Sequence, residues 1–85
     1  MLTVSVVSPE RVLFEGQADS VVAPAFDGEV GILKSHAPMV TLLGSGELRV
    51  TSGGSVTRFT VEGGFLQVAD DQVRVVTEKA AASGG

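Results

Sequence analysis

Residues 47–76, ELRVTSGGSVTRFTVEGGFLQVADDQVRVV, carry the clearest structural pattern in the chain. Apolar and polar residues alternate along 47–51, 58–62 and 72–75. A period of two places one side of an extended chain in a core and the other side in water. Residues that favour turns separate these runs at 52–54, 63–64 and 70–71. The stretch therefore predicts short strands joined by tight turns.

The same period occurs at the start of the chain, where Leu2, Val4 and Val6 alternate with polar residues. Further turn signals at 8–10, 26–28 and 44–46 divide the rest into short segments. No segment has the 3.6-residue apolar period of an amphipathic helix. Eight or nine strands at this spacing predict an all-β sandwich or barrel.

The composition changes near the C-terminus, in the sequence EKAAASGG at 78–85. Its alanines favour helix, but eight residues are too few to sustain one alone. We therefore expect a single domain over residues 1–79 and a flexible tail over residues 80–85.

The amino-acid composition excludes several classes of protein. At 44% hydrophobic residues, the 85-residue chain is too apolar to be disordered. It has no cysteine, so it forms neither a disulfide framework nor a thiolate zinc site. Six Lys and Arg are scattered among ten acidic residues, giving a net charge of −4, whereas nucleic-acid sites concentrate basic residues. No apolar run approaches the roughly 18–20 residues of a membrane span. We expect a soluble protein that binds no nucleic acid.

The candidate catalytic groups are weak. Ser35 and His36 are adjacent, but neighbours in an extended chain point to opposite sides and do not form a nucleophile–base pair. A single histidine without cysteine offers little to a metal ion. The adjacent carboxylates Asp70 and Asp71 lie where a hairpin turn is expected. By residue type alone, His36 is either a packing residue or an exposed contact for a partner.

Gly63-Gly64 lacks the Lys-Ser/Thr of a phosphate loop and is instead typical of a bend or a close approach of two backbones. We expect no catalytic, cofactor-binding or metal-binding residues. An alternative class is a small carrier domain modified at Lys34, because lipoyl and biotinyl domains are all-β, acidic and of similar size. The context ILKSHAP does not match the lysine hairpin of those domains.

Three separated motifs resemble the epsilon subunit of F-type ATP synthases. GEVGILKSHAPMVTLLGSGELRV at 28–50 is similar to the family's signature, with residues 28–32 and 36–38 matching in order and spacing. LTVSVVSPERVLFEGQADSVVAP at 2–24 resembles its first hairpin, and FTVEGGFLQVADDQVRVVTEKA at 59–80 resembles the end of its sandwich. The resemblance covers residues 1–79.

This resemblance implies a flattened β-sandwich of about eight to ten short, mostly antiparallel strands. In the family, this domain is a non-catalytic part of the rotor, which joins the gamma subunit to the ring of c subunits. It therefore implies those two partners and a role in coupling ion flow to ATP synthesis, with no cofactor of its own. The implied location is peripheral, through the complex, on the cytoplasmic face of a bacterial plasma membrane or the equivalent organellar or thylakoid face.

The resemblance also implies two contact surfaces. Toward gamma it places Ser8, His36, Pro38, Met39 and Thr41. Toward the c ring it places Gly28, Glu29, Val30 and Gly31. Pro38 holds Ala37 extended, so we interpret His36 as a docking residue presented from a stiff segment. Met39-Val40 and Leu42-Leu43 are apolar pairs whose members cannot all face a core, which predicts an exposed apolar patch beside His36.

Two departures from the family pattern affect these expectations. The family often has an aromatic residue and Pro-Gly before the histidine, whereas this chain has Leu33-Lys34-Ser35, which predicts a less rigid and more basic loop. The family's C-terminal helical hairpin has no counterpart within these 85 residues. Inhibition of ATP hydrolysis and ATP sensing, which reside in that hairpin, are not carried over.

Overall fold

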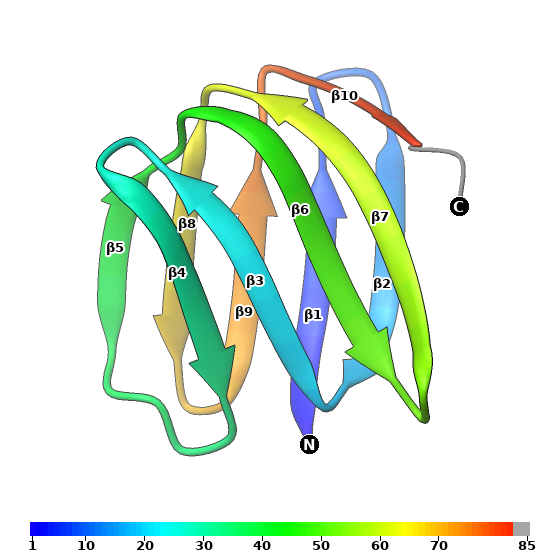
Figure 1. Cartoon of the computed structure of the whole chain (residues 1–85), viewed down its shortest axis with the longest axis vertical. Helices are drawn as coiled ribbons and strands as arrows, with labels where there is room; N and C mark the ends of the chain where they lie inside the picture. The colour runs from blue at the N-terminus through cyan, green and yellow to red at the C-terminus, as the bar shows by residue number, and fades with distance from the viewer. Residues whose placement is uncertain (83–85) are drawn as a thin grey trace.

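Ten β-strands make up two sheets in the computed structural model, which describes residues 1–82 (Figure 1). Sheet A has the strand order β2-β1-β9-β8-β5, and sheet B has the order β10-β7-β6-β3-β4. The strands are β1 (Leu2–Val7), β2 (Val12–Ala18), β3 (Ser20–Ala25), β4 (Gly28–Leu33), β5 (Met39–Leu42), β6 (Ser45–Ser52), β7 (Ser55–Glu62), β8 (Phe65–Ala69), β9 (Gln72–Val76) and β10 (Lys79–Ala82). Only β1 and β9 pair in parallel among these strands. The predicted all-β, mostly antiparallel sandwich is confirmed.

The core lies between the two sheets and contains the alternating apolar residues. The fully or almost fully buried side chains include Leu2, Val4, Val6, Val21, Ile32, Leu48, Val50, Val61, Leu66, Val68, Val73 and Val75. Burying one such side chain stabilises the fold by about 1.5–3 kcal/mol. Phe14 of sheet A meets Phe59 of sheet B edge to face, with ring centroids 6.4 Å apart. The period of two therefore identified the inner faces correctly.

The chain crosses between the sheets at neighbouring points where Gly44, Gly63 and Gly64 meet. The amide of Leu43 donates to the carbonyl of Gly64 at 3.0 Å, and the amide of Gly63 donates to the carbonyl of Gly44 at 3.3 Å. Gly64 has a φ of 101°, and a Cβ there would overlap the carbonyl oxygen of Val76. A side chain is therefore excluded at Gly64, which confirms the close approach expected at Gly63-Gly64.

The turn between β8 and β9 is the expected hairpin turn at Asp70-Asp71. Both residues have positive φ, 51° and 59° respectively. Aspartate tolerates this left-handed region better than most residues, and two such residues in succession match the twist of a two-residue hairpin. The two carboxylates therefore belong to a turn, as their position in the sequence predicted.

The C-terminal segment differs from the expected tail over 80–85. Lys79–Ala82 form β10, which pairs antiparallel with β7, and Ala80 packs against the core. The buried Thr77 leads into this strand, and its hydroxyl donates to the carbonyl of Lys79 at 2.8 Å. Composition predicted a tail because a strand this short is specified by its partner β7 and not by its own sequence. Residues 83–85 of the expected tail lie outside the described part of the chain.

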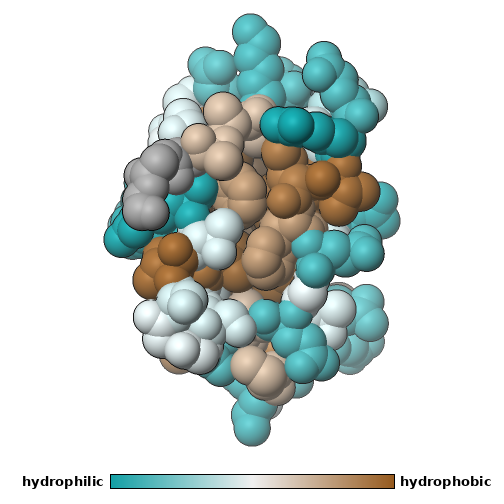
Figure 2. All heavy atoms as spheres, turned by 90° about the vertical axis from the view of Figure 1, so that its right-hand side faces the viewer, coloured by the Kyte–Doolittle hydropathy of each residue, from teal (hydrophilic) through white to brown (hydrophobic). Residues whose placement is uncertain are grey.

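The edge formed by β2, β7 and β10 is apolar along its middle (Figure 2). Leu13, Phe14 and Ala80 on these strands are partly buried against the core, and Val12 and Val56 are exposed. A bulge between β1 and β2 shifts the pairing from Val6–Phe14 to Val7–Val12. The shift leaves Val12 opposite Val7 at the end of β1.

Candidate docking surfaces on the two outer faces

The outer face of sheet A carries a continuous line of apolar side chains. Strand pairing aligns Val12 with Val7, Val7 with Val76, Val76 with Phe65, and Phe65 with Leu42. Directly opposed residues on one face of a sheet have Cβ atoms about 4.5–5.5 Å apart. We call these five residues the apolar row. Leu42 and Val12 are 63% and 57% exposed, so the row is open to solvent in the isolated chain.

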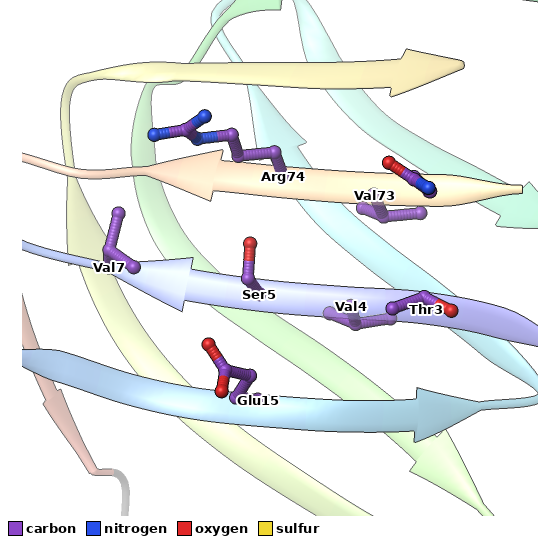
Figure 3. Close-up of a pocket in the computed structure, with 8 residues that line it drawn as sticks. Thr3, Val4, Ser5, Val7, Glu15, Val73 and Arg74 are labelled. Atoms are coloured by element: carbon purple, nitrogen blue, oxygen red, sulfur yellow. The ribbon is translucent and has the colours of Figure 1, made fainter. Parts of the chain in front are cut away.

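A second line on the same face is largely polar. Pairing aligns Glu15, Ser5, Arg74, Gln67 and Val40 across the five strands. In Figure 3, Ser5, Glu15 and Arg74 project from neighbouring strands on one side of the sheet, with Val7 beside them, and together they line a shallow depression. Sheet A therefore presents an outer surface that is part apolar and part able to form hydrogen bonds.

The alternation along β5 decides which of its residues lie on this surface. Val40 and Leu42 point outward and are 69% and 63% exposed, whereas Met39 packs against the core. Thr41 is partly buried and alternates with the two outward residues. The predicted surplus of exposed apolar side chains on this segment is confirmed, but Leu42 lies at the end of β5 away from His36. The outward members of the segment are Val40 and Leu42, and Met39 and Thr41 lie on the inward side of the strand.

His36 lies in the loop between β4 and β5, which carries the chain from sheet B to sheet A. Its side chain is half-buried, and Nδ1 lies 2.7 Å from the carbonyl oxygen of Ala37. Because a carbonyl oxygen only accepts, Nδ1 must carry the hydrogen of this bond. Nε2 is then the ring nitrogen that could bind another group. Pro38 follows as an exposed residue.

Ser8 lies far from His36 on the same sheet. It follows the end of β1, and its amide donates to the carbonyl of Arg11 at 2.9 Å within a tight turn. His36 precedes β5, which runs in the same direction as β1 and forms the edge of the sheet opposite β2 (Figure 1). The two residues therefore mark opposite corners of sheet A. One partner touching both would cross its outer face diagonally.

The outer face of sheet B is charged. The Nη1 atom of Arg49 lies 3.7 Å from Glu29 Oε2 and 3.5 Å from Glu47 Oε1. Arg58 Nε lies 3.7 Å from the same Glu47 oxygen. The resulting series, Glu29–Arg49–Glu47–Arg58, runs across the sheet, and we call it the charged series. Exposed ion pairs of this kind contribute about 0–1 kcal/mol each.

The residues 28–31 occupy the start of β4, which is the free edge of sheet B. Glu29 is exposed and paired with Arg49, whereas Val30 is partly buried against the core. A Cβ at Gly28 or Gly31 would meet no atom within 4 Å in the described part of the chain. Gly28 also has a φ of 130°, which favours glycine. This strand edge therefore leaves room for a close external contact.

Two contacts were not foreseen from the sequence: the ion pair of Glu29 with Arg49, and a hydrogen bond from the Ser35 amide to Asp71 Oδ1 at 2.6 Å. Neither pair is close in sequence, so strand pairing had to be known before either contact could be found. The apolar row had a visible signal, because its members Val7, Phe65, Val76 and Leu42 each adjoin another apolar residue.

Residues 1–82 contain no group of three His, Cys, Asp or Glu side chains placed to hold a metal ion. No helix in this range is long and apolar enough to cross a membrane. Lys34 lies in the loop that passes from sheet B to sheet A. It is therefore not displayed at the tip of a hairpin, which the carrier alternative requires.

The fold and these surfaces define a small two-sheet β-sandwich with contrasting outer faces. Its family follows from sequence comparison: residues 1–83 match the model of the ATP synthase delta/epsilon chain, beta-sandwich domain. The chain belongs to this family. It is 45% identical over 80 residues to an ATP synthase epsilon chain of Leptospira borgpetersenii, covering 94% of this chain and 63% of the relative. It is 47% identical over 75 residues to that of Desulforamulus reducens, covering 88% and 57%.

Solved structures show the same fold. One chain in the mitochondrial ATP synthase OSCP/F1/c-ring structure of Euglena gracilis superposes with a TM-score of 0.88 at 24% identity, covering 95% of this chain and 52% of that one. A chain in the central stalk/c-ring structure of the Tetrahymena thermophila mitochondrial ATP synthase gives 0.77 at 17% identity, covering 94% and 65%. The present chain spans about three-fifths of the length of the curated relatives it matches.

Proposed function

We propose that this chain is the β-sandwich of a non-catalytic central-stalk subunit of an F-type ATP synthase. It docks a gamma subunit on the outer face of sheet A and contacts the c ring through the start of β4. In this role it transmits ring rotation to gamma, and so couples ion flow to ATP synthesis. It is held at the membrane face by the complex and does not itself enter the bilayer.

The apolar row is the observation that carries the proposal for gamma. An isolated soluble domain has little reason to leave Leu42, Phe65 and Val12 in one exposed line, and large exposed apolar patches mark interfaces. The polar line beside it supplies hydrogen-bonding groups, as a typical interface requires. The molecule measures 27 × 25 × 22 Å, so one broad face has an area of the order of the ~800 Å² that each partner buries in a stable complex.

His36 and Ser8 lie at two opposite corners of this surface. The half-buried imidazole of His36 has Nε2 left for a partner, and Pro38 stiffens the segment that follows it. Of the other gamma-facing residues, Pro38 is exposed, whereas Met39 and Thr41 act by supporting the outward Val40 and Leu42 on the same strand. The apolar row runs along the Ser8 end of sheet A, so a diagonal partner would cover both corners, the polar line between them and part of the apolar row.

The c-ring contact rests on different physics. Glu29 offers a carboxylate 58% exposed at its side chain, and the bare backbone at Gly28 and Gly31 admits a close approach. A carboxylate meeting basic or amide groups on another protein forms charge-assisted hydrogen bonds, which water and salt weaken. Because Arg49 already neutralises part of this charge, the contact is a weak one and depends on the rest of the docked complex.

Co-elution with a purified gamma subunit on a sizing column tests the proposal directly. The wild-type chain should elute with gamma as a complex, and Leu42→Asp should elute separately. A carrier domain would instead elute alone and would acquire a mass shift at Lys34 in the presence of its ligase. Elution of the wild-type chain apart from gamma would refute the proposed docking.

The proposed role in coupling has a separate test. Adding the chain to an ATP synthase depleted of its epsilon subunit should restore ATP-driven proton pumping without suppressing ATP hydrolysis. Strong inhibition of hydrolysis by these 85 residues would contradict a purely mechanical role for the sandwich.

A further inference from the structure

The loop that presents His36 has a backbone that needs external support. Ser35 adopts a φ of 67°, a left-handed conformation that favours glycine over serine. Within the loop, the amide of His36 donates to the carbonyl of Leu33 at 3.2 Å. This single backbone bond closes a short turn between strands of different sheets. A serine at this position therefore needs a further contact to keep the turn in one conformation.

That contact comes from Asp71, 36 residues further along the chain. Its Oδ1 atom accepts a hydrogen bond from the amide of Ser35 at 2.6 Å. A bond from a backbone amide to a carboxylate is shorter and stronger than one between neutral groups. The bond ties the loop before β5 to the turn between β8 and β9. Strands β5 and β8 are neighbours in sheet A.

Asp71 is itself held firmly. Its carbonyl accepts a hydrogen bond from the amide of Thr3 at 2.8 Å, which joins the turn to β1, next to the middle of the sheet. Its side chain is half-buried, whereas that of the neighbouring Asp70 is exposed. The carboxylate is therefore presented from a fixed point to a loop in which every residue of 34–38 except the half-buried His36 is exposed.

We propose that Asp71 is a positioning residue that latches the 34–38 loop and so sets the orientation of His36 toward the gamma subunit. The latch replaces the stiffness that Leu33-Lys34-Ser35 does not supply. This inference rests on the proposed docking of gamma at His36. It assigns to Asp71 no contact with the partner itself.

Three variants separate the latch from the turn. Asp71→Gly removes the carboxylate and keeps a residue that accepts the φ of 59°. Asp70→Gly makes the same backbone change one residue earlier, at a φ of 51°, and leaves Asp71 in place. Asp71→Asn keeps an oxygen that accepts a hydrogen bond and tolerates positive φ, so it is the conservative rescue. Thermal unfolding verifies that all three are folded.

The first measurement is amide hydrogen exchange by NMR on the chain alone. Asp71→Gly should raise the exchange rate of the Ser35 amide about tenfold, because its charged acceptor is lost. Asp70→Gly should leave that rate unchanged, and Asp71→Asn should stay within about threefold of the wild type, because its neutral oxygen accepts more weakly. An unchanged rate in Asp71→Gly would overturn the latch.

The second measurement is the Kd for a gamma subunit. Asp71→Gly should weaken binding roughly three- to tenfold, because the loop must then be ordered on binding. Asp71→Asn should restore most of the affinity, and His36→Ala should weaken binding in the same direction. If His36→Ala loses affinity and Asp71→Gly does not, the positioning role is wrong. If neither variant loses affinity while Ser35 exchange still rises, the latch stands and the proposed docking at His36 fails.

Discussion

The two outer faces of this sandwich are built in the same way and present opposite chemistry. Each belongs to a five-stranded sheet whose other side is buried against the same core. On sheet A the strand register lines up apolar residues, and on sheet B it lines up acids and arginines within 3.5–3.7 Å of one another. The inner faces are constrained by folding, so the core does not account for the difference between the outer faces.

The energies of the two faces differ accordingly. The charged series is already satisfied in the isolated chain, and each exposed pair adds only about 0–1 kcal/mol to stability. The apolar row still exposes apolar surface, and covering it yields about 25 cal/mol for each Å² removed from water. Sheet A therefore has much to gain from a partner, whereas sheet B has little.

The largest expected effect comes from adding a side chain at Gly64, where the chain passes from sheet B to sheet A. Gly64→Ala forces a Cβ into the carbonyl of Val76, so it should lower the free energy of unfolding by about 3 kcal/mol or more. Chemical denaturation followed by circular dichroism measures this loss.

Gly53→Ala is the matched control for that change. Gly53 also has positive φ, at 57°, but a Cβ there meets no atom within 4 Å. Its cost should be limited to the conformational penalty of about 1–2 kcal/mol. Equal losses in the two variants would mean that Gly64 is needed only for its φ and not for the close approach of the two backbones.

The next effect distinguishes the faces directly. Leu42→Asp places a charge in the apolar row and should weaken binding to a gamma subunit by about 2 kcal/mol or more, measured by titration calorimetry. Folding should be almost unaffected, because Leu42 is 63% exposed.

Leu33→Asp tests the specificity of that result. Leu33 is 64% exposed and lies on the outward side of β4 in sheet B. The same substitution there should change gamma affinity by less than about 0.5 kcal/mol, as for a surface site outside an interface. A comparable loss from Leu33→Asp would remove the distinction between the two faces.

A smaller effect is expected at Glu29. Glu29→Ala should leave folding and gamma binding nearly intact, because one exposed ion pair contributes about 0–1 kcal/mol. In reconstituted membranes it should lower ATP-driven proton pumping relative to ATP hydrolysis, more visibly at high ionic strength, where the remaining contacts are screened. His36→Ala serves as the comparison and should weaken gamma binding instead. Unchanged pumping per ATP at every salt concentration would show that Glu29 makes no ring contact.

The smallest effect concerns the charged series alone. Arg49→Ala removes the common partner of Glu29 and Glu47 and should lower the free energy of unfolding by about 1 kcal/mol or less. The loss should shrink further in high salt, since the pairs are exposed. A loss above about 2 kcal/mol would show that sheet B depends on this series for stability.

Much of the fold could be predicted from the sequence because the information is local. The alternation at 47–51, 58–62 and 72–75 predicted which residues face inward. Glycines at 63–64 and aspartates at 70–71, which tolerate positive φ, predicted the turns. The strand β10 could not be predicted, because Ala80–Ala82 carry no pattern of their own and are ordered by pairing with β7. Short strands of this kind depend on context more than on propensity.

The surfaces could be predicted only in part. Adjacent apolar residues at Val6-Val7, Phe65-Leu66 and Val75-Val76 indicate that one member of each pair faces outward. Which outward residues meet across strands depends on register, and the register includes a bulge next to Val7 and a parallel pairing of β1 with β9. The latch between Asp71 and Ser35 is harder still, since it joins two loops through a side chain.

Hydroxyl-radical footprinting of the chain with and without a gamma subunit tests the central claim most directly. It reports the accessibility of individual side chains, and both outer faces carry exposed leucines of nearly equal accessibility, Leu42 and Leu33. We predict that gamma protects Leu42 and Phe65 from oxidation and leaves Leu33 as reactive as in the free chain. Protection of Leu33 with Leu42 still fully reactive would place gamma on sheet B and contradict the account.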